Sequence, residues 1–365
     1  MSFKQTITHN LLNIPGWNTK RRIVVFESDD WGAIRMPSKA VFEYLVSKGF
    51  NLQNNPYEKN DSLATEDDLC ALFEVLRKYR DCKGNNPMFT ANCVVANPDF
   101  ERIEKDKFEQ YYNESITATM KRYKGCEHSF DLWIQGLTEG LFFPQCHGRE
   151  HLNVARWMHI LRSGDEDNLI AFFSGMMGIP PKFNPKKGNV FQVALDDSLY
   201  KAEPIENILI DALNRFEKLF GYLSKTFIAP CYTWRSSLEK TLYDNGVLGI
   251  QGIVYQRDPN KGLIRHWQGT RNEFGQIYTI RNCSFEPTLQ PDIDSISDCL
   301  YRIKCAFRWH KPAVISTHRI NYIGAIREEN RINNLKQLDT LLSLIVRNWP
   351  DVEFLNSGQL VNEIR

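Results

Sequence analysis

Short runs of apolar, often β-branched residues alternate with helical patterns along the chain. The runs occupy residues 22–26, 88–95, 141–145, 226–230, 252–255 and 313–317. Between them apolar residues recur at helical spacing, as at Leu69, Leu72, Phe73 and Leu76 after a predicted N-cap at Thr65. Each short run is expected to be a buried strand. Because a parallel pair of strands needs a crossover, usually a helix, the alternation predicts an α/β fold with a parallel sheet or barrel.

The length of 365 residues exceeds the usual size of a single core, which leaves two domains or one large barrel with insertions. Residues 178–197 and 256–276 show neither the strand nor the helix pattern, and we expect long loops there. No clear linker separates two halves. We therefore predict one domain spanning residues 1–365, with insertions at about 50–85, 178–200 and 256–276. A boundary near residue 180 is the alternative.

The composition excludes several classes of protein. Lys and Arg number 45 against 44 Asp and Glu, and 42% of residues are hydrophobic, which fits a folded protein with no affinity for nucleic acid. Nine cysteines without a C-x-x-C pair suit reduced thiols better than disulfides or a cysteine zinc cluster. The N-terminus lacks a basic segment followed by an apolar core, and no long apolar run occurs. We therefore expect a cytoplasmic protein without a transmembrane segment. The sequence gives no basis for an oligomeric state.

The first run ends in two adjacent carboxylates, Asp29 and Asp30, within the stretch RRIVVFESDDWG. Neighbouring carboxylates repel each other, so the pair is either a solvated turn or a pair that chemistry requires. The second reading needs partner residues elsewhere in the chain.

His147 and His151 are four residues apart, and the apolar pattern continues through Val154 and Met158. On a helix this spacing places both imidazoles on one face, where they can bind the same metal ion. Zinc in catalytic sites takes three protein ligands, and Asp30 is the natural third. Two surface or capping histidines are the alternative, because H-x-x-x-H often occurs by chance.

Two further strand ends carry polar or aromatic groups. The run at 313–317 is followed by His318, and the run at 226–230 is followed by Cys231, Tyr232 and Trp234. In a β/α barrel the carboxyl ends of the strands converge on one rim, so these groups would meet the Asp and His pairs in one cleft.

The order of these motifs resembles the metal-dependent polysaccharide deacetylases, also called carbohydrate esterase family four or the chitooligosaccharide-deacetylase homology domain. That family has a strand ending in Asp-Asp, then H-x-x-x-H, then an Arg-x-Pro type of turn, then a strand ending in His. Here Asp29 and Asp30, the His pair, IAPCY and ISTH ending at His318 match in order between about residues 22 and 320. The resemblance implies a distorted (β/α)7 barrel with loop insertions.

The resemblance also implies a divalent metal ion, with zinc preferred, on Asp30, His147 and His151. The ion would polarise an acetyl carbonyl and acidify a water molecule, with Asp29 as general base and His318 as general acid. A backbone N–H of Cys231 or Tyr232 would stabilise the oxyanion. Candidate substrate-binding or oxyanion residues are Trp31, Pro230, Cys231, Tyr232, Trp234 and His266. The implied reaction removes N- or O-acetyl groups from a carbohydrate, such as an N-acetylated sugar, a glycan precursor or a polysaccharide.

The sequence departs from the family pattern at two places. Trp31 stands where the family has a glycine, and Ile228 and Ala229 stand where an arginine would hold the first aspartate. That contact is either absent or comes from another residue, for which Arg235 is a candidate. The departures leave two alternatives open. One is a hydrolase of a non-peptide C–N bond in a small amide or ureide, and the other is a catalytically inactive carbohydrate-binding protein.

Overall fold

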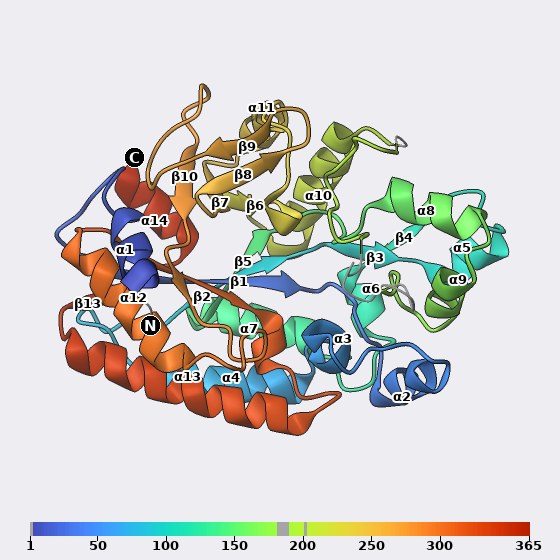
Figure 1. Ribbon diagram of the computed structural model, residues 1–365, viewed down its shortest axis with the longest axis horizontal. Coiled ribbons are helices and arrows are strands. Elements are labelled where there is room, and N and C mark those ends of the chain that lie inside the picture. The colour runs from blue at the N-terminus through green and yellow to red at the C-terminus, as the bar shows by residue number, and fades with distance from the viewer. Residues whose placement is uncertain (1–2, 181–189, 201–202) are drawn as a thin grey trace.

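Parallel strands form the centre of the fold in a computed structural model, which describes residues 3–180, 190–200 and 203–365 (Figure 1). The strands of the central sheet are β1 (Arg22–Trp31), β2 (Phe89–Cys93), β5 (Phe142–Cys146), β6 (Thr226–Ile228), β7 (Gly249–Gly252), β10 (Ile277–Ile280), β11 (Cys283–Ser284), β12 (Ala313–His318) and β13 (Val352–Phe354). Their order is β10-β7-β6-β5-β2-β1-β12-β11, and β13 pairs with the start of β1. The pairings within this sheet are parallel, as the alternating sequence pattern predicts.

The two edge strands of this sheet, β10 and β11, are consecutive in the chain. Only Arg281 and Asn282 separate them, so the two edges lie within about 11 Å of each other along the chain. The sheet therefore closes on itself as a barrel. With β10 and β11 taken as one bent strand, the described residues supply seven barrel strands, and the predicted distorted (β/α)7 barrel is confirmed.

Helices surround the barrel and gather at one end of it. They are α1 (Phe3–Leu11), α2 (Lys39–Ser47), α3 (Pro56–Asn60), α4 (Glu66–Arg77), α5 (Phe100–Lys105), α6 (Ile116–Met120), α7 (Ser129–Thr138), α8 (Val154–Arg162), α9 (Glu166–Phe173), α10 (Ile205–Phe220), α11 (Leu238–Asp244), α12 (Ser295–Arg308), α13 (Glu328–Asn348) and α14 (Ser357–Ile364). The contacts α12 to α13, α13 to α4 and α4 to α7 form a continuous outer layer along one side (Figure 1). Helices α2, α3, α8 and α9 lie at the end toward which β1 points, where the strand carboxyl ends meet (Figure 1).

Local sequence signals account for several of these boundaries. Helix α4 begins after Thr65, whose hydroxyl accepts a hydrogen bond from the Asp68 N–H while the Asp68 carboxylate accepts one from the Thr65 N–H. Its apolar stripe, including Leu69 and Leu72, is buried as predicted. The strand expected at 252–255 lies instead at 249–252, and the sequence pattern missed β10 and β11.

The predicted insertions have different structures. The first contains α3 and α4, and the third contains an antiparallel hairpin of β8 (Tyr255–Asp258) and β9 (Gly262–Arg265). In the second, residues 181–189 lie outside the described part of the chain. Between α5 and α6 lies the short strand β4 (Asn113–Ser115), which pairs with β3 (Ala96–Pro98). Whether the chain is a single domain stays a prediction.

The barrel interior beneath the strand carboxyl ends is polar. Asn92 on β2 and Gln251 on β7 are both 0% exposed and exchange two amide hydrogen bonds of 2.8 and 3.0 Å. Gln251 also donates to the Thr226 hydroxyl at 2.8 Å. Because buried polar groups are costly unless they are hydrogen-bonded, this layer is a rigid base for whatever lies above it.

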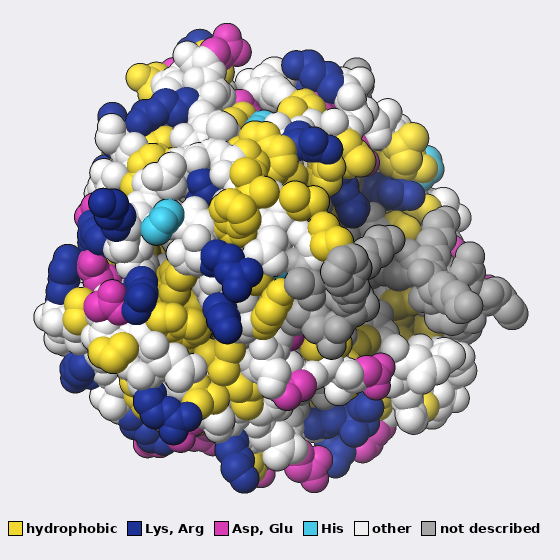
Figure 2. Space-filling view, turned by 60° about the vertical axis from the view of Figure 1, so that its left-hand side comes forward, with side chains coloured by type: hydrophobic (Ala, Val, Ile, Leu, Met, Phe, Trp, Pro, Cys, Tyr) yellow, Lys and Arg dark blue, Asp and Glu magenta, His cyan; other side chains and the backbone are white. Residues whose placement is uncertain are grey.

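The surface carries charges of both signs. Lys and Arg side chains lie among Asp and Glu side chains on the face drawn in Figure 2, with hydrophobic side chains between them. Among the described residues, no helix combines the length and the apolar character that crossing a membrane requires.

Candidate metal-dependent active site

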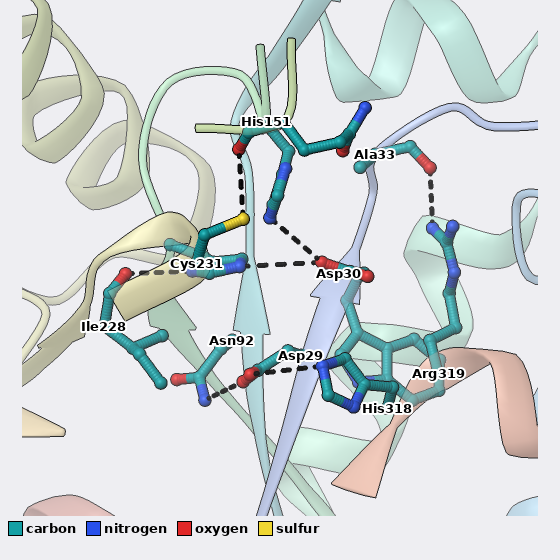
Figure 3. Close-up of polar contacts among 12 residues, drawn as sticks. Asp29, Asp30, Ala33, Asn92, His151, Ile228, Cys231, His318 and Arg319 are labelled. Atoms are coloured by element: carbon teal, nitrogen blue, oxygen red, sulfur yellow. Dashed lines mark hydrogen bonds and ion pairs between the residues drawn. The ribbon is translucent and has the colours of Figure 1, made fainter. Parts of the chain in front are cut away.

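Both aspartates at the end of β1 face the same cleft because the strand is irregular there. Successive side chains of a regular strand point to opposite faces. The register between β1 and β2 shifts between Ser28 and Trp31, and Asp30 has a left-handed backbone with φ of 72°. Aspartate tolerates this conformation better than most residues, and such bulges are frequent beside functional sites. The irregularity therefore brings Asp29 and Asp30 to one pocket (Figure 3).

Asp30, His147 and His151 lie together at the centre of this pocket. The Oδ1 atom of Asp30 is 3.4 Å from Nε2 of His151 and 3.6 Å from Nε2 of His147, and the three side chains are almost fully buried (Figure 3). The ligand atoms of all three lie within 4.8 Å of one another. In a tetrahedral zinc site with bonds of about 2.0–2.1 Å, neighbouring ligand atoms are about 3.3–3.4 Å apart. The donor set and its spacing therefore fit a zinc-like ion.

The histidine pair is not helical, in contrast to the sequence prediction. His147 directly follows β5, Gly148 has φ of 109°, and α8 begins only at Val154. The loop nevertheless brings the two rings within 5.0 Å of each other. His147 is further fixed by Nδ1, which donates to the Ile228 carbonyl at 2.9 Å and leaves the Nε2 lone pair for a ligand. His151 Nδ1 is buried and has no hydrogen-bond partner among the described residues.

Charged neighbours keep Asp30 ionised. Burial alone would raise its pKa, but His151, Arg35 and His147 hold the pKa well below its ordinary value. Arg35 contributes Nη2, which donates to Asp30 Oδ2 at 3.3 Å. A carboxylate that stays ionised is what a metal ligand must be.

Arg281 holds Asp29 by a bidentate contact. Its Nη1 donates to Oδ2 of Asp29 at 2.6 Å and its Nη2 donates to Oδ1 at 2.7 Å, while the Asn92 amide also donates to Oδ1 at 2.8 Å. Burial alone would raise the pKa of Asp29, but Arg281, together with His147 and His318, holds it below its ordinary value. The arginine missing from the expected turn is thus supplied from the β10–β11 junction. Arg235, the candidate from sequence, instead pairs with Asp197 and Glu206.

Arg281 also contacts a second carboxylate that the sequence analysis did not single out. Its Nε donates to Glu27 at 2.7 Å, and the Ser357 hydroxyl donates to the other oxygen of Glu27 at 2.7 Å. Glu27 lies two residues before Asp29, on the same face of β1. The only sequence signal for Glu27 and Arg281 is a charged residue within or directly after an apolar run.

His318 lies beside Asp29 because their strands pair in register. The backbones of Asp29 and His318 are partners in the β1–β12 ladder, and Nε2 of His318 is 3.8 Å from Oδ2 of Asp29. The other ring nitrogen contacts Glu286 at 2.6 Å. Burial alone would lower the pKa of His318, but Glu286 and the aspartates raise it to about 9. The imidazole is therefore protonated at neutral pH.

The turn after β6 offers one free backbone donor. Cys231 and Tyr232 both have left-handed backbones, with φ of 55° and 56°, a strained conformation common at functional sites. The Tyr232 N–H donates to the Ala229 carbonyl, whereas among the described residues the Cys231 N–H has no partner. Of the two donors expected from sequence, Cys231 is the one available to an oxyanion.

Four of the expected substrate-binding residues lie away from the pocket lining. Trp31 is 1% exposed and packs edge-on against Phe142, so the change from glycine fills the core and does not narrow the cleft. Pro230 and Trp234 are buried, and the Trp234 indole donates to Glu239. His266 stacks on Tyr278 at 3.7 Å, outside the pocket.

The pocket has a volume of about 310 Å³. It is lined by Asp29, Asp30, Arg35, Asn55, Tyr57, Glu58, His147, His151, Gln192, Ala229, Cys231, Tyr232 and His318. The residues from β1, the His loop, the β6 turn and β12 were expected there, whereas Arg35, the residues near α3 and Gln192 were not. The arrangement joins a possible metal site, an ionised carboxylate and a protonated imidazole in one small cavity.

No protein-family model and no curated protein matches the sequence. Several solved structures are similar at low identity. One is a protein from Mycobacterium smegmatis assigned to the polysaccharide deacetylases, at 12% identity and a TM-score of 0.44 over 96% of this chain and 93% of that one. Another is a GH57-type branching enzyme from Pyrococcus horikoshii, at 10% identity and 0.45 over 95% and 71%. A third is a CE4 family pseudoenzyme from Bacillus anthracis, at 10% identity and 0.40 over 94% and 66%. Any function assigned to the chain therefore has to come from the geometry of its site.

Proposed function

We propose that the protein is a metal-dependent hydrolase that removes N- or O-acetyl groups from a carbohydrate. The observation that carries the proposal is the buried Asp30, His147 and His151 cluster, with ligand atoms within 4.8 Å of one another, beside a second carboxylate and a protonated histidine. A zinc-like ion bound there would polarise the acetyl carbonyl and acidify a water molecule. Zinc is the preferred ion because the donor set is two imidazoles and a carboxylate.

Asp29 is the proposed general base. It is not part of the metal-binding cluster, it lines the same pocket, and Arg281 keeps it ionised so that it can accept a proton from water. The contact with Arg281 also lowers the basicity of Asp29. Proton transfer from water to Asp29 would therefore require that a bound metal ion lowers the pKa of that water. Glu27 and Asn92 act through Arg281 and the Asp29 carboxylate, which they hold in place.

His318 is the proposed general acid. Its ring is held by Glu286 on one side and lies 3.8 Å from Asp29 on the other, so it can pass a proton to the departing amine or alcohol. The Cys231 N–H is the proposed donor to the oxyanion that forms on the acetyl carbon.

A second candidate keeps the same chemistry but changes the substrate. A cavity of about 310 Å³ lies at the lower end of the range for small-molecule sites, which favours a small amide or ureide, or a single sugar, over a long polymer. The inactive carbohydrate-binding alternative was motivated by the missing arginine. That motive no longer applies, because Arg281 makes the contact.

The proposal is tested by metal analysis and acetate release on the same protein samples. Wild type, His147→Ala and Asp29→Asn are compared with N-acetylated sugars and a panel of small amides as substrates. We expect His147→Ala to lose metal and activity, and Asp29→Asn to keep metal but lose about 100-fold in activity. Full metal occupancy in His147→Ala would refute the ligand set, and full activity in Asp29→Asn would refute the base.

A further inference from the structure

One wall of the pocket contains no proposed metal ligand, general base or general acid. It consists of Asn55, Tyr57 and Glu58, at the start of α3 and within it, together with Arg35. The guanidinium of Arg35 lies over the Tyr57 ring at 5.1 Å. Helix α3 ends at Asn60 and is followed by its C-cap Asp61, whose carboxylate accepts two hydrogen bonds from the buried Arg319. The wall is therefore anchored to the barrel beside His318.

In the part of the chain that the structure describes, the charged side chains around the pocket are paired, with one exception. The pairs are Arg281 with Glu27 and Asp29, Arg319 with Asp61, His318 with Glu286, and Arg35 with Asp30 and Asp61. Within the described ranges, no hydrogen bond or ion pair reaches the carboxylate of Glu58. The charge of Arg35 is shared by two carboxylates at 3.3 and 3.6 Å, so it does not leave a free cation in the pocket.

Glu58 is nevertheless buried, with an exposed fraction of 3%, and it lines the pocket. Burying a carboxylate without a partner is costly, and in Glu58 burial raises the pKa to about 7 despite the nearby Arg35. A buried acceptor that has no partner among the described residues and faces a cavity is suited to a donor that arrives with a ligand.

Other unpaired polar groups surround the same space. Both amide atoms of Gln192, which lies beside Cys231, are buried without a hydrogen-bond partner among the described residues. Nε of Arg35 makes no hydrogen bond to the described residues either, although it lies 3.6 Å from the Asp61 carboxylate. An amide, a guanidinium and a carboxylate together offer donors and acceptors to a ring that carries several hydroxyls. The volume of about 310 Å³ suits one such ring and its acyl group.

We infer that Glu58 is a specificity-determining residue that accepts a hydrogen bond from a hydroxyl or ammonium group of the substrate, so that the pocket takes single neutral or cationic amino sugars and disfavours anionic ones. The inference rests on the proposed function, since it names the substrate class of the same site. The reason for the charge preference is that Glu58, the one unpaired charged side chain among the described residues that line this wall, is a carboxylate.

The test compares two sugars that differ by one carboxylate, N-acetylglucosamine and N-acetylmuramic acid. Their binding to metal-loaded wild type, Glu58→Gln and Asp67→Asn is measured by calorimetry, with metal content and acetate release determined on the same samples. Asp67 is exposed in the first turn of α4, so Asp67→Asn removes one negative charge outside the pocket.

We expect wild type and Asp67→Asn to bind N-acetylglucosamine about tenfold or more tightly than N-acetylmuramic acid, and Glu58→Gln to lose most of that preference with its metal unchanged. Equal or tighter binding of N-acetylmuramic acid by wild type, or a preference unchanged within twofold in Glu58→Gln, would overturn the inference. If Glu58→Gln does not fold, the wild-type preference alone decides. If wild type releases acetate and Glu58→Gln shows the same sugar preference as wild type, only the role of Glu58 is refuted. A metal-loaded wild type that neither binds nor deacetylates either sugar refutes the carbohydrate function and the inference together.

Discussion

Replacement of Arg281 by methionine should destabilise the fold and inactivate the protein. The Arg281 side chain is 0% exposed and lies between Glu27 at 2.7 Å and Asp29 at 2.6 Å. Methionine keeps much of the volume but leaves Glu27 without its counter-charge and Asp29 with only the His318 imidazole, 3.8 Å away. Removing one partner of a buried ion pair costs about 3–5 kcal/mol of unfolding free energy, and the burial of all three groups means that solvent screening reduces this little.

The loss should depend on pH in a defined direction. In Arg281→Met we expect the pKa of Asp29 to rise above the unfolded value and the pKa of Glu27, which burial already raises in the wild type, to rise further, because burial is no longer opposed by Arg281. A carboxyl whose folded pKa is raised contributes stability that is present at low pH and is lost as pH rises through that pKa. The variant should therefore be more destabilised at about pH 8 than at about pH 5. In the wild type, Arg281 helps to hold the pKa of Asp29 below its ordinary value. Asp29 therefore contributes stability that is present above its unfolded pKa and is lost as pH falls through its folded pKa.

The assay is urea unfolding of wild type and Arg281→Met at both pH values, with activity measured under native conditions. Arg235→Met is the matched control, because Arg235 also has two acidic partners, Asp197 and Glu206, but its side chain is 21% exposed. We expect it to lose only about 0–1 kcal/mol. A loss in Arg281→Met that is equal at both pH values, or no larger than in Arg235→Met, would refute the assignment of Arg281 as the counter-charge.

Three further predictions follow from the site and the core. Activity should fall as pH rises through about 9, because the pKa of His318 is raised to about 9, and in Glu286→Gln the fall should begin at lower pH; a pH–rate profile of kcat/KM that is unchanged in Glu286→Gln would contradict the role of this pair. Trp31→Ala should lose about 3–5 kcal/mol of unfolding free energy by leaving a cavity beside Phe142, with KM unchanged, and a raised KM without lost stability would place Trp31 at the substrate after all. Removal of metal by a chelator should lower the Tm of wild type but not of His147→Asn, since a ligand that binds only the folded state stabilises it, and equal shifts in both would argue against the site.

The sequence by itself determined the parts of the fold that depend on neighbouring residues. The alternation of apolar runs with helical stripes predicted the parallel α/β architecture, and Thr65 before an apolar stripe predicted the N-cap of α4. The convergence of strand ends predicted that the Asp pair, the His pair, the β6 turn and His318 would line one pocket, and they do. These inferences succeed because burial periodicity and capping are local properties of the chain.

The tertiary structure alone decided what holds those residues in place. Arg281 reaches Asp29 across 252 positions of sequence, because the β10–β11 junction closes the barrel next to β1. No local pattern could assign that contact, and the sequence pointed to Arg235 instead. The bulge at Asp30 and the non-helical His loop likewise depend on strand register.

The pocket wall shows the same limit of sequence reasoning. Glu58 looks like an ordinary surface residue of a short polar helix, PYEKN, whereas in the folded chain it is buried and lines the cavity. Sequence therefore determined which chemical groups the strand ends carry. Burial and charge pairing between distant segments decided which of these groups are held, which are free, and what the pocket can accept, because both depend on how the whole chain closes.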